Sequence, residues 1–252
     1  DWYPKVNIFC DPIPYDAGLT LGGCRYVWHQ ILDNPKIDNK IFQNRTPYLG
    51  REYSKDEIEL ALNKNKNKLS VDEVTDEDVV DLLCVDDNVI SVYGGGSESG
   101  RRALGNRSIL ADPRSKNMKD IINDKVKHRQ WFRPFAPSIL REEVSNWFIH
   151  DADSPYMSVA LPFKEGKSKI VPAVNHNDDT ARLQSVDKND NEWYHSFIKK
   201  FYEKTDVPIV LNTSFNDREP IVETPEHAIN CFLRTNIDYL YFRDYGLLIK
   251  KV

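Results

Sequence analysis

The segment from Gly94 to Ser108 is rich in glycine and arginine, with the sequence Gly-Gly-Gly-Ser-Glu-Ser-Gly-Arg-Arg-Ala-Leu-Gly-Asn-Arg-Ser. Glycines lack the Cβ atom that keeps a backbone away from a ligand, so the amides of such a loop can bind phosphate oxygens. Arg102 and Arg107 would add permanent charge and bidentate contacts. The run matches neither the dinucleotide-binding glycine pattern nor a P-loop, which ends in Gly-Lys-Ser/Thr. Composition alone therefore predicts either a phosphate-binding loop or a solvated turn.

A second cationic cluster runs from Lys127 to Ser138, where Arg129 and Arg133 alternate with aromatic residues and prolines. A stiff segment of this kind can aim long cationic side chains at a polyphosphate with little entropy loss. The same pattern suits stacked RNA bases, and Lys127 alone suits the C-terminal end of a helix. The window 101–133 holds ten Lys or Arg against three acidic residues, whereas the whole chain has a net charge of −5. This contrast indicates a bound anion and argues against general nucleic-acid binding.

Length and composition limit the class of protein. The chain has 252 residues, of which 40% are hydrophobic, enough for one large domain or a domain with an appendage. No apolar run of about 18 residues occurs, so no membrane span is expected. Four cysteines lie far apart without a CxxC pair, which predicts free thiols in a cytoplasmic protein. The start, Asp1-Trp2-Tyr3-Pro4, has no initiator Met and no signal peptide, and we expect it to lie inside a longer protein.

Helices and strands are predicted in mixed order without a strict βαβ repeat, so the expected fold class is α+β. Helices are predicted for 19–31, 55–62, 76–84, 116–128 and 193–202, and from 225 onward. Capping boxes at Ser54 and Thr75 mark two of these starts. Strands are predicted for 89–93, 207–211, 237–242 and 247–250. The Lys- and Asn-rich stretch after residue 62 is predicted to be a loop.

Four motifs occur in a fixed order: Gly100–Arg114 (GRRALGNRSILADPR), Arg133–Ser138 (RPFAPS), Thr180–Gln184 (TARLQ) and Leu211–Asn216 (LNTSFN). Together they resemble the C-terminal region of the O-carbamoyltransferases that modify nodulation factors and antibiotics. The resemblance begins at about residue 45 and continues to the C-terminus. It implies a YrdC-like domain over 45–252, with a mixed sheet and flanking helices. It also implies that residues 1–44 are a linker and the last part of an actin/Hsp70-like acceptor domain.

The resemblance implies an enzyme that forms carbamoyl-adenylate from carbamoyl phosphate and ATP, with Mg²⁺ accompanying the nucleotide. The carbamoyl group would then pass to a hydroxyl-bearing acceptor in an N-terminal acceptor domain or on a companion chain, and a homo-oligomer is compatible with this. Catalytic anion contacts would come from Arg102, Lys127 and Arg133. The full set of ATP and substrate contacts would be Arg102, Lys127, Arg133, Arg182, Asn212 and Ser214.

Each of these residues also has a purely structural interpretation. Arg182 could be a buried structural arginine, and Asn212 and Ser214 could cap the turn after a strand. Glu98 could hydrogen-bond a clamping arginine instead of a ligand. His176 lies in an Asn- and Asp-rich loop, where a solvated histidine is the default interpretation.

Asp16 lies in a glycine-rich run that resembles the last such motif of the acceptor domain. The resemblance implies that this aspartate helps to hold a metal, in particular iron, with histidines that precede this chain. A single carboxylate is not a metal site, and an Asp that opens a turn before a helix is the structural alternative. The chain also departs from the family pattern, since Arg101 replaces a proline and Gly96 replaces an arginine. We hypothesise that Arg101 supplies the charge lost at position 96.

Two other functions fit the same residues. One is a tRNA-modification enzyme similar to threonylcarbamoyl-adenylate synthase, which would depend on threonine and bicarbonate. The other is a non-catalytic nucleotide- or RNA-binding module, which would bind RNA in a salt-sensitive way without turnover.

Overall fold

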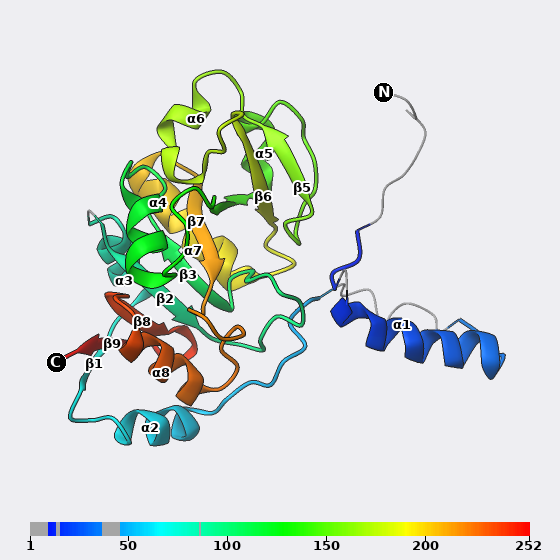
Figure 1. The fold of residues 1–252 in the computed structure, drawn as a ribbon, viewed down its shortest axis with the longest axis horizontal. Coiled ribbons are helices and arrows are strands. Elements are labelled where there is room, and N and C mark those ends of the chain that lie inside the picture. Colours follow the sequence, from blue (N-terminus) through cyan, green and yellow to red (C-terminus); the bar gives the residue numbers. More distant parts are fainter. Residues whose placement is uncertain (1–9, 14–15, 37–45, 86) are drawn as a thin grey trace.

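The computed structural model describes residues 10–13, 16–36, 46–85 and 87–252. Within these residues, nine strands form one mixed sheet in the order β1-β9-β8-β2-β3-β7-β4-β6-β5 (Figure 1). The strands are β1 (Leu69–Glu73), β2 (Val89–Tyr93), β3 (Arg107–Ala111), β4 (Ala136–Leu140), β5 (Val159–Pro162), β6 (Thr180–Val186), β7 (Ile209–Ser214), β8 (Tyr239–Phe242) and β9 (Leu247–Lys251). The pairs β2–β8 and β4–β6 are parallel and the others are antiparallel. The expected α+β class is confirmed.

The sheet is flanked by α2 (Lys55–Asn63), α3 (Asp76–Leu83), α4 (Met118–Ile121), α5 (Val144–Trp147), α6 (Lys167–Ile170), α7 (Glu192–Thr205) and α8 (Pro225–Arg234). Helix α1 (Leu19–Tyr26) instead extends away from the body of the molecule (Figure 1). Short helical turns are η1 (Asp16–Gly18), η2 (Val27–Ile31), η3 (Ile122–Val126), η4 (Arg141–Glu143), η5 (Pro172–Val174) and η6 (Arg243–Tyr245). α7 packs on β4 and β7, whereas α8 packs on β2 and β8. Among the residues that the structure describes, none of the helices has the length and apolar character needed to cross a bilayer.

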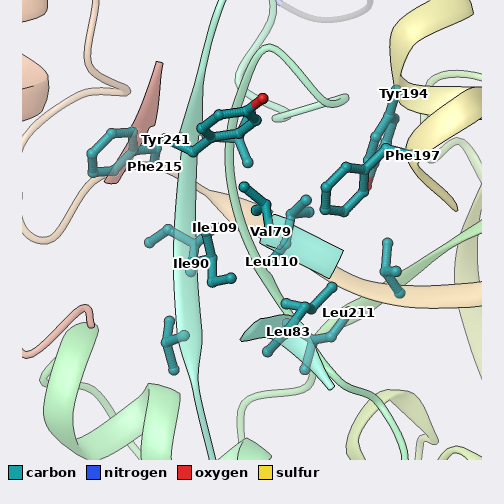
Figure 2. Close-up of a cluster of buried hydrophobic side chains, with 14 of the residues drawn as sticks. Val79, Leu83, Ile90, Ile109, Leu110, Tyr194, Phe197, Leu211, Phe215 and Tyr241 are labelled. Carbon is teal, nitrogen blue, oxygen red and sulfur yellow. The ribbon is translucent and has the colours of Figure 1, made fainter. Parts of the chain in front are cut away.

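The hydrophobic core lies between the central strands and the helices α3 and α7. Every residue of β2, β3 and β4 is buried. Figure 2 shows side chains from α3, β2, β3, α7 and β7 meeting in one cluster, which includes Val79, Leu83, Ile90, Ile109, Leu110, Tyr194, Phe197 and Leu211. The core therefore fixes the three adjacent strands β3, β7 and β4 rigidly against one another.

Most predicted elements are confirmed. The capping boxes form at Ser54, where Oγ accepts from the Glu57 amide, and at Thr75, where Oγ1 accepts from the Asp78 amide. Strand β2 has the predicted bounds, and β8 and β9 form the predicted antiparallel pair. The predicted helix 19–31 is present as α1 followed by the π-helical turn η2, and Figure 1 shows it extending away from the body of the molecule.

Three predictions were wrong in detail. Part of the stretch after residue 62 is not a loop, because Leu69–Glu73 forms the edge strand β1, paired with β9. The helix predicted for 116–128 begins at Met118 and continues after Ile121 as the π-helical turn η3. The strand predicted to end at Leu211 continues to Ser214, because it is bonded on both sides by β3 and β4.

The division of the chain into 1–44 and 45–252 remains a prediction. The described part of the first segment consists of 10–13 and 16–36, of which Asp16–Ile31 are helical, while residues 37–45 lie outside the described residues.

Candidate functional site

A cavity of about 590 Å³ opens beside the ends of β4 and β7. Its wall contains all six residues expected to contact ATP or substrate: Arg102, Lys127, Arg133, Arg182, Asn212 and Ser214. It also contains Arg101, Ala103, Arg129, Pro134, Phe135, Ala136, Met157, His176, Thr213, Asn216 and Asp217. We refer to this space as the anion cavity. The structure thus brings together residues that are up to 112 positions apart in the sequence, from Arg102 to Ser214.

The order of the strands explains this gathering. Asn212 of β7 lies opposite Leu110 of β3 on one side and opposite Ala136 of β4 on the other. Arg102 precedes β3, Arg133 precedes β4, and β6 lies beside β4 and carries Arg182. Because these strands are neighbours, the segments that lead into or out of them meet at one place.

The anion cavity is strongly cationic. Of the described residues on its wall, six are arginine or lysine and one, Asp217, is acidic. Burial and the nearby charge of Arg133 lower the pKa of Arg129 to about 10. Burial and the charge of Arg101 likewise lower the pKa of Arg182. Burial is the larger cause of both shifts and repulsion between neighbouring cations the smaller one, and a bound polyanion would oppose both by favouring the charged forms.

Lys127 follows η3 and reaches across to the end of β7. Its Nζ donates to the backbone oxygen of Ser214 and, at 2.8 Å in each case, to both the backbone oxygen and Oδ1 of Asn216. Burial, aided by the charge of Arg129, lowers the pKa of Lys127 to about 7. The ammonium is therefore held in place by a loop and is poised to gain or lose a proton near neutrality.

Asn212 lies inside β7 and does not cap the turn after it, whereas Ser214 is the last residue of β7 and its side chain does contact the turn that follows. The Asn212 Nδ2 donates to the backbone oxygen of Ala103 at 3.0 Å, to Ser138 Oγ at 3.0 Å and to Gln184 Oε1 at 3.1 Å. Ser214 Oγ donates to Asn216 Oδ1 at 2.7 Å. Asn212 thereby fixes the backbone next to Arg102, and Ser214 helps to hold the loop that contacts Lys127.

The glycine-rich loop does not offer its amides to a ligand in the way that its composition suggested. The amides of Leu104 and Asn106 donate to Glu98 Oε1 at 2.7 and 2.9 Å, and the Gly95 amide donates to Asp244 Oδ2 at 2.6 Å. Glu98 is therefore a buried side chain that organises the loop by accepting hydrogen bonds from its amides. These amides are therefore bonded within the fold, because a buried loop must satisfy its own polar groups.

Arg107 is also not a ligand contact. Its side chain is fully buried and donates to the backbone oxygens of Gly94 and Asn106 at 2.8 and 2.9 Å and of Gly95 at 3.1 Å. Its guanidinium carbon lies 3.7 Å from the centre of the Tyr93 ring. Of the two arginines that the motif suggested, Arg102 thus lies on the wall of the anion cavity, whereas Arg107 stabilises the loop from its buried side.

His176 lies on the cavity wall, where its Nδ1 is 3.0 Å from Thr180 Oγ1 and burial lowers its pKa. Asp16 is exposed in η1. Within the described ranges, no three His, Cys, Asp or Glu side chains converge on a point that could hold a metal ion. Any metal at Asp16 would therefore need further ligands from outside the described residues.

Sequence reasoning did not select Arg129 or Asn216 as site residues. Both were visible in the quoted motifs, since Arg129 alternates with aromatic residues and Asn216 closes the run from Leu211. What the sequence could not reveal is that the Asn216 side chain contacts Lys127, 89 positions away.

Comparison with known proteins identifies the family of this chain. A family model described as "Carbamoyltransferase C-terminus" matches residues 81–250, which include all six residues named above. The chain belongs to this carbamoyltransferase family. The matched region contains the glycine-rich loop, the anion cavity and the central strands that hold them.

Relatives of the carbamoyltransferase chain extend the match beyond this region. An uncharacterised protein of Synechocystis sp. is 38% identical, over 96% of this chain and 43% of its own length. Nodulation protein NolNO of Sinorhizobium fredii is 39% identical, over 97% of this chain and 36% of its own length. The chain thus spans less than half the length of these relatives. Full-length HypF, solved in a phosphate- and nucleotide-bound form, aligns over 73% of this chain and 22% of its own, with 17% identity and a TM-score of 0.44, too distant a likeness to bear on function.

Proposed function

We propose that the anion cavity binds ATP and carbamoyl phosphate, and that this region forms carbamoyl-adenylate for transfer to a hydroxyl. The observation that carries the proposal is the cavity itself. In a member of a carbamoyltransferase family, its described wall places six cations around one acid in about 590 Å³. ATP and carbamoyl phosphate together bring about six negative charges, so such a wall offsets the repulsion between two phosphorylated substrates.

The proposed reaction balances in two steps. Water cleaves carbamoyl phosphate into carbamate and phosphate, and a carbamate oxygen then attacks the α-phosphorus of ATP. The bond from that phosphorus to the bridging oxygen breaks, and pyrophosphate leaves. Catalysis of phosphoryl transfer consists mainly of positioning and charge stabilisation, so no covalent nucleophile is required. Arg102 and Arg133 would clamp phosphate oxygens, Lys127 would balance the charge on the leaving group, and Arg182, Asn212 and Ser214 would orient the substrates.

Mg²⁺ fits this site only as a companion of the nucleotide. Asp217 is the acidic residue on the described wall, so the protein offers no carboxylate cage there. Mg²⁺ in nucleotide sites is commonly bound through substrate phosphates and one or two carboxylates. When bound, it would neutralise phosphate charge during the departure of pyrophosphate.

The acceptor hydroxyl and any iron site belong to parts that the anion cavity does not supply. The matched region covers 43% of one relative's length and 36% of the other's, so most of each relative lies outside the match. We assign acceptor binding to an acceptor domain or companion chain, and Asp16 is the residue of this chain that would contribute to a metal there. A homo-oligomer is compatible with this arrangement.

Pyrophosphate release tests the proposal directly. The 252-residue chain is incubated with ATP and carbamoyl phosphate, and we expect pyrophosphate only when both are present. Release that instead requires threonine and bicarbonate would favour the tRNA-modification function. The proposal fails if neither ATP nor inorganic tripolyphosphate binds the chain in calorimetry, because the anion cavity would then not bind phosphates at all.

A further inference from the structure

His176 is a side chain of the anion-cavity wall that the proposed phosphate contacts do not use. It lies half-buried in the turn between η5 and β6. The His176 amide donates to the Thr180 oxygen at 2.9 Å, and the Asp179 amide donates to the His176 oxygen at 3.1 Å. The Phe163 amide, which follows β5, donates to the Asp179 oxygen at 3.0 Å and ties the turn to the neighbouring strand. The imidazole is therefore carried by a fixed turn and not by a solvated loop.

A hydrogen-bonded relay fixes the tautomer of this imidazole. Thr180 Oγ1 lies 2.7 Å from Asp178 Oδ1 and 3.0 Å from His176 Nδ1. The bond from Thr180 lowers the pKa of Asp178, so its carboxylate is ionised at neutral pH and can only accept. The Thr180 hydroxyl must therefore donate its one proton to Asp178, and its oxygen accepts from Nδ1–H of His176. In this neutral tautomer the basic lone pair lies on Nε2.

The basic nitrogen faces the anion cavity. His176 lies on the cavity wall, whereas Thr180 and Asp178 do not. Because Nδ1 points to Thr180, the opposite edge of the ring, which carries Nε2, is the edge toward the cavity. Within the part of the chain that the structure describes, no group is hydrogen-bonded to Nε2. The nitrogen is thus available to a bound molecule.

Burial and neighbouring charges decide the protonation state of the ring. Burial lowers the pKa of His176, and the Asp178 carboxylate opposes this shift. The charges of Arg182 and Lys119 add to the lowering. The imidazole is therefore neutral at pH 7 and able to take up a proton. Arg182 lies two residues after Thr180 on β6 and shares the cavity wall with His176, so a phosphate held by Arg182 would lie close to the basic nitrogen.

We propose that His176 is the general base that activates water for the cleavage of carbamoyl phosphate, with Thr180 and Asp178 as positioning residues. The inference rests on the proposed function and adds the group that takes the proton in its first step. The water oxygen forms a bond to the carbonyl carbon, and its first proton passes to Nε2 of His176. The bond from this carbon to the bridging phosphate oxygen breaks, and the second proton passes to the departing phosphate. The products are carbamate, hydrogen phosphate and an imidazolium, which returns its proton to solvent.

Two carbamoyl sources separate this step from the attack on ATP in the 252-residue chain. Carbamate, supplied as ammonium carbamate, needs no hydrolysis, so its reaction with ATP bypasses the base. His176→Asn keeps an amide N–H that can donate to Thr180 but has no basic nitrogen. With carbamoyl phosphate, we expect this variant to release pyrophosphate about 100- to 1000-fold more slowly, the usual contribution of a general base. With ammonium carbamate, the variant should match the original chain.

The matched control is the same change at another histidine. His150 is exposed and lies outside the anion cavity, so His150→Asn should leave the rates with both carbamoyl sources unchanged. At the relay, Thr180→Val should slow the reaction with carbamoyl phosphate less than His176→Asn does. Thr180→Ser retains the hydroxyl and should restore the original rate.

The pH dependence is a readout that a purely structural role would not change. A base must be unprotonated, so release from carbamoyl phosphate should fall as the pH drops through the lowered pKa of His176. This acid limb should be absent in His176→Asn. An imidazolium that only bound phosphate would give the reverse profile, with activity lost as the pH rises through the same pKa.

The failures of the inference and of the proposed function are distinguishable. If His176→Asn keeps its rate with carbamoyl phosphate, or loses the reaction with both carbamoyl sources equally, His176 is not the base. If the original chain uses carbamoyl phosphate but not carbamate, free carbamate is not an intermediate and the step assigned to His176 does not occur. If the original chain releases pyrophosphate with neither source, the proposed function itself fails.

Discussion

The glycine-rich loop has two sides that use the same residue types for opposite purposes. On one side Arg102 lies on the wall of the anion cavity, among other cations and beside one acid. On the other side Arg107 and Arg243 are buried, and their charge is shared among backbone oxygens, the Asn106 side chain and aromatic rings. An arginine whose guanidinium is buried against backbone oxygens and aromatic rings stabilises the fold, whereas one on a cavity wall lined by other cations can bind an anion.

The glycines divide in the same way. A Cβ at Gly94 would lie 2.3 Å from the Arg243 side chain, and one at Gly96 would lie 2.5 Å from the Gly50 oxygen. Both glycines therefore permit close packing between the loop and the rest of the fold, and neither lies on the wall of the anion cavity. The Gly96 contact also explains why an arginine at that position would not fit in this chain. Arg101 lies on the wall of the anion cavity, and the hypothesis that it supplies the charge lost at position 96 stays a prediction, which an unchanged ATP affinity of Arg101→Ala would contradict.

The largest expected effect comes from the cavity side. Arg133→Ala should lower the rate of pyrophosphate release by about 100- to 1000-fold, which is about 3–4 kcal/mol of transition-state stabilisation. Because the Arg133 side chain is exposed, its removal should change the free energy of unfolding by no more than about 0.5 kcal/mol. Arg133→Lys, the matched control, keeps the charge without the planar fork and should have an intermediate rate. A large fall in stability would erase the proposed contrast between the two sides.

The opposite side should respond in the opposite manner. Arg107→Met leaves the oxygens of Gly94 and Gly95 without their buried donor, and should cost about 3 kcal/mol of unfolding free energy in urea. Tripolyphosphate binding to the folded protein should be unchanged in calorimetry at low temperature. Arg107→Lys should recover part of the lost stability. Weaker tripolyphosphate binding by a fully folded Arg107→Met protein would place this residue on the ligand side after all.

Lys127 links the two sides, and its titration gives a smaller effect. Its folded-state pKa of about 7 lies below its usual value, so the ligand-free ammonium loses its proton as the pH rises through neutrality. Asp217, Glu219 and Cys231 oppose this shift, but burial and Arg129 outweigh them. Bound phosphate favours the charged form, so tripolyphosphate affinity should fall above pH 7 by up to about tenfold per pH unit. Calorimetry in two buffers should reveal proton uptake, and Lys127→Met should abolish it.

The same shift affects stability with a definite sign. Between about pH 7 and the usual lysine pKa, the unfolded chain binds more protons at this position than the folded chain does. The Lys127 contribution to the free energy of unfolding therefore rises with pH across that window, while ligand affinity falls. If both quantities moved in the same direction, Lys127 would not be the group that titrates.

The smallest expected effect is that of Ser54→Ala, which serves as a reference for a change that affects stability alone. Ser54→Ala removes the capping box of α2, which lies away from the anion cavity, and should cost about 1 kcal/mol of unfolding free energy. Pyrophosphate release and tripolyphosphate affinity should be unchanged. Ser54→Thr, which preserves the cap, should behave like the original chain. A loss of activity in Ser54→Ala would mean that a purely structural change can mimic a cavity defect.

Local signals in the sequence were enough for many elements. The α2 and α3 starts followed from Ser54 and Thr75, whose side chains satisfy amides only three residues away. The strand β1 was missed because it carries few apolar residues and forms only through pairing with β9, nearly 180 positions later. Tertiary pairing, and not local preference, determines an edge strand of this kind.

The candidate site shows the same limit. The motifs were sufficient to select Arg102, Lys127, Arg133, Arg182, Asn212 and Ser214, whose roles remain proposals. They could not distinguish Arg102 from Arg107, because the distinction depends on which side of the loop faces the core. They also could not show that Glu98 accepts hydrogen bonds from amides of the loop, or that Asn216 accepts one from Lys127.

The position of β7 has a consequence for synthesis on the ribosome. β7 lies between β3 and β4 in the sheet and pairs with both. Both of those strands are synthesised about 70 residues or more before β7. Until residues 209–214 are made, two separate sheet fragments expose the open edges of β3 and β4, and such edges invite pairing with other chains. A polyphosphate could not rescue this nascent form, because the arginines are already present but have no shared scaffold. Messages that stop early should therefore yield aggregation-prone products, even when they encode most of the cationic wall.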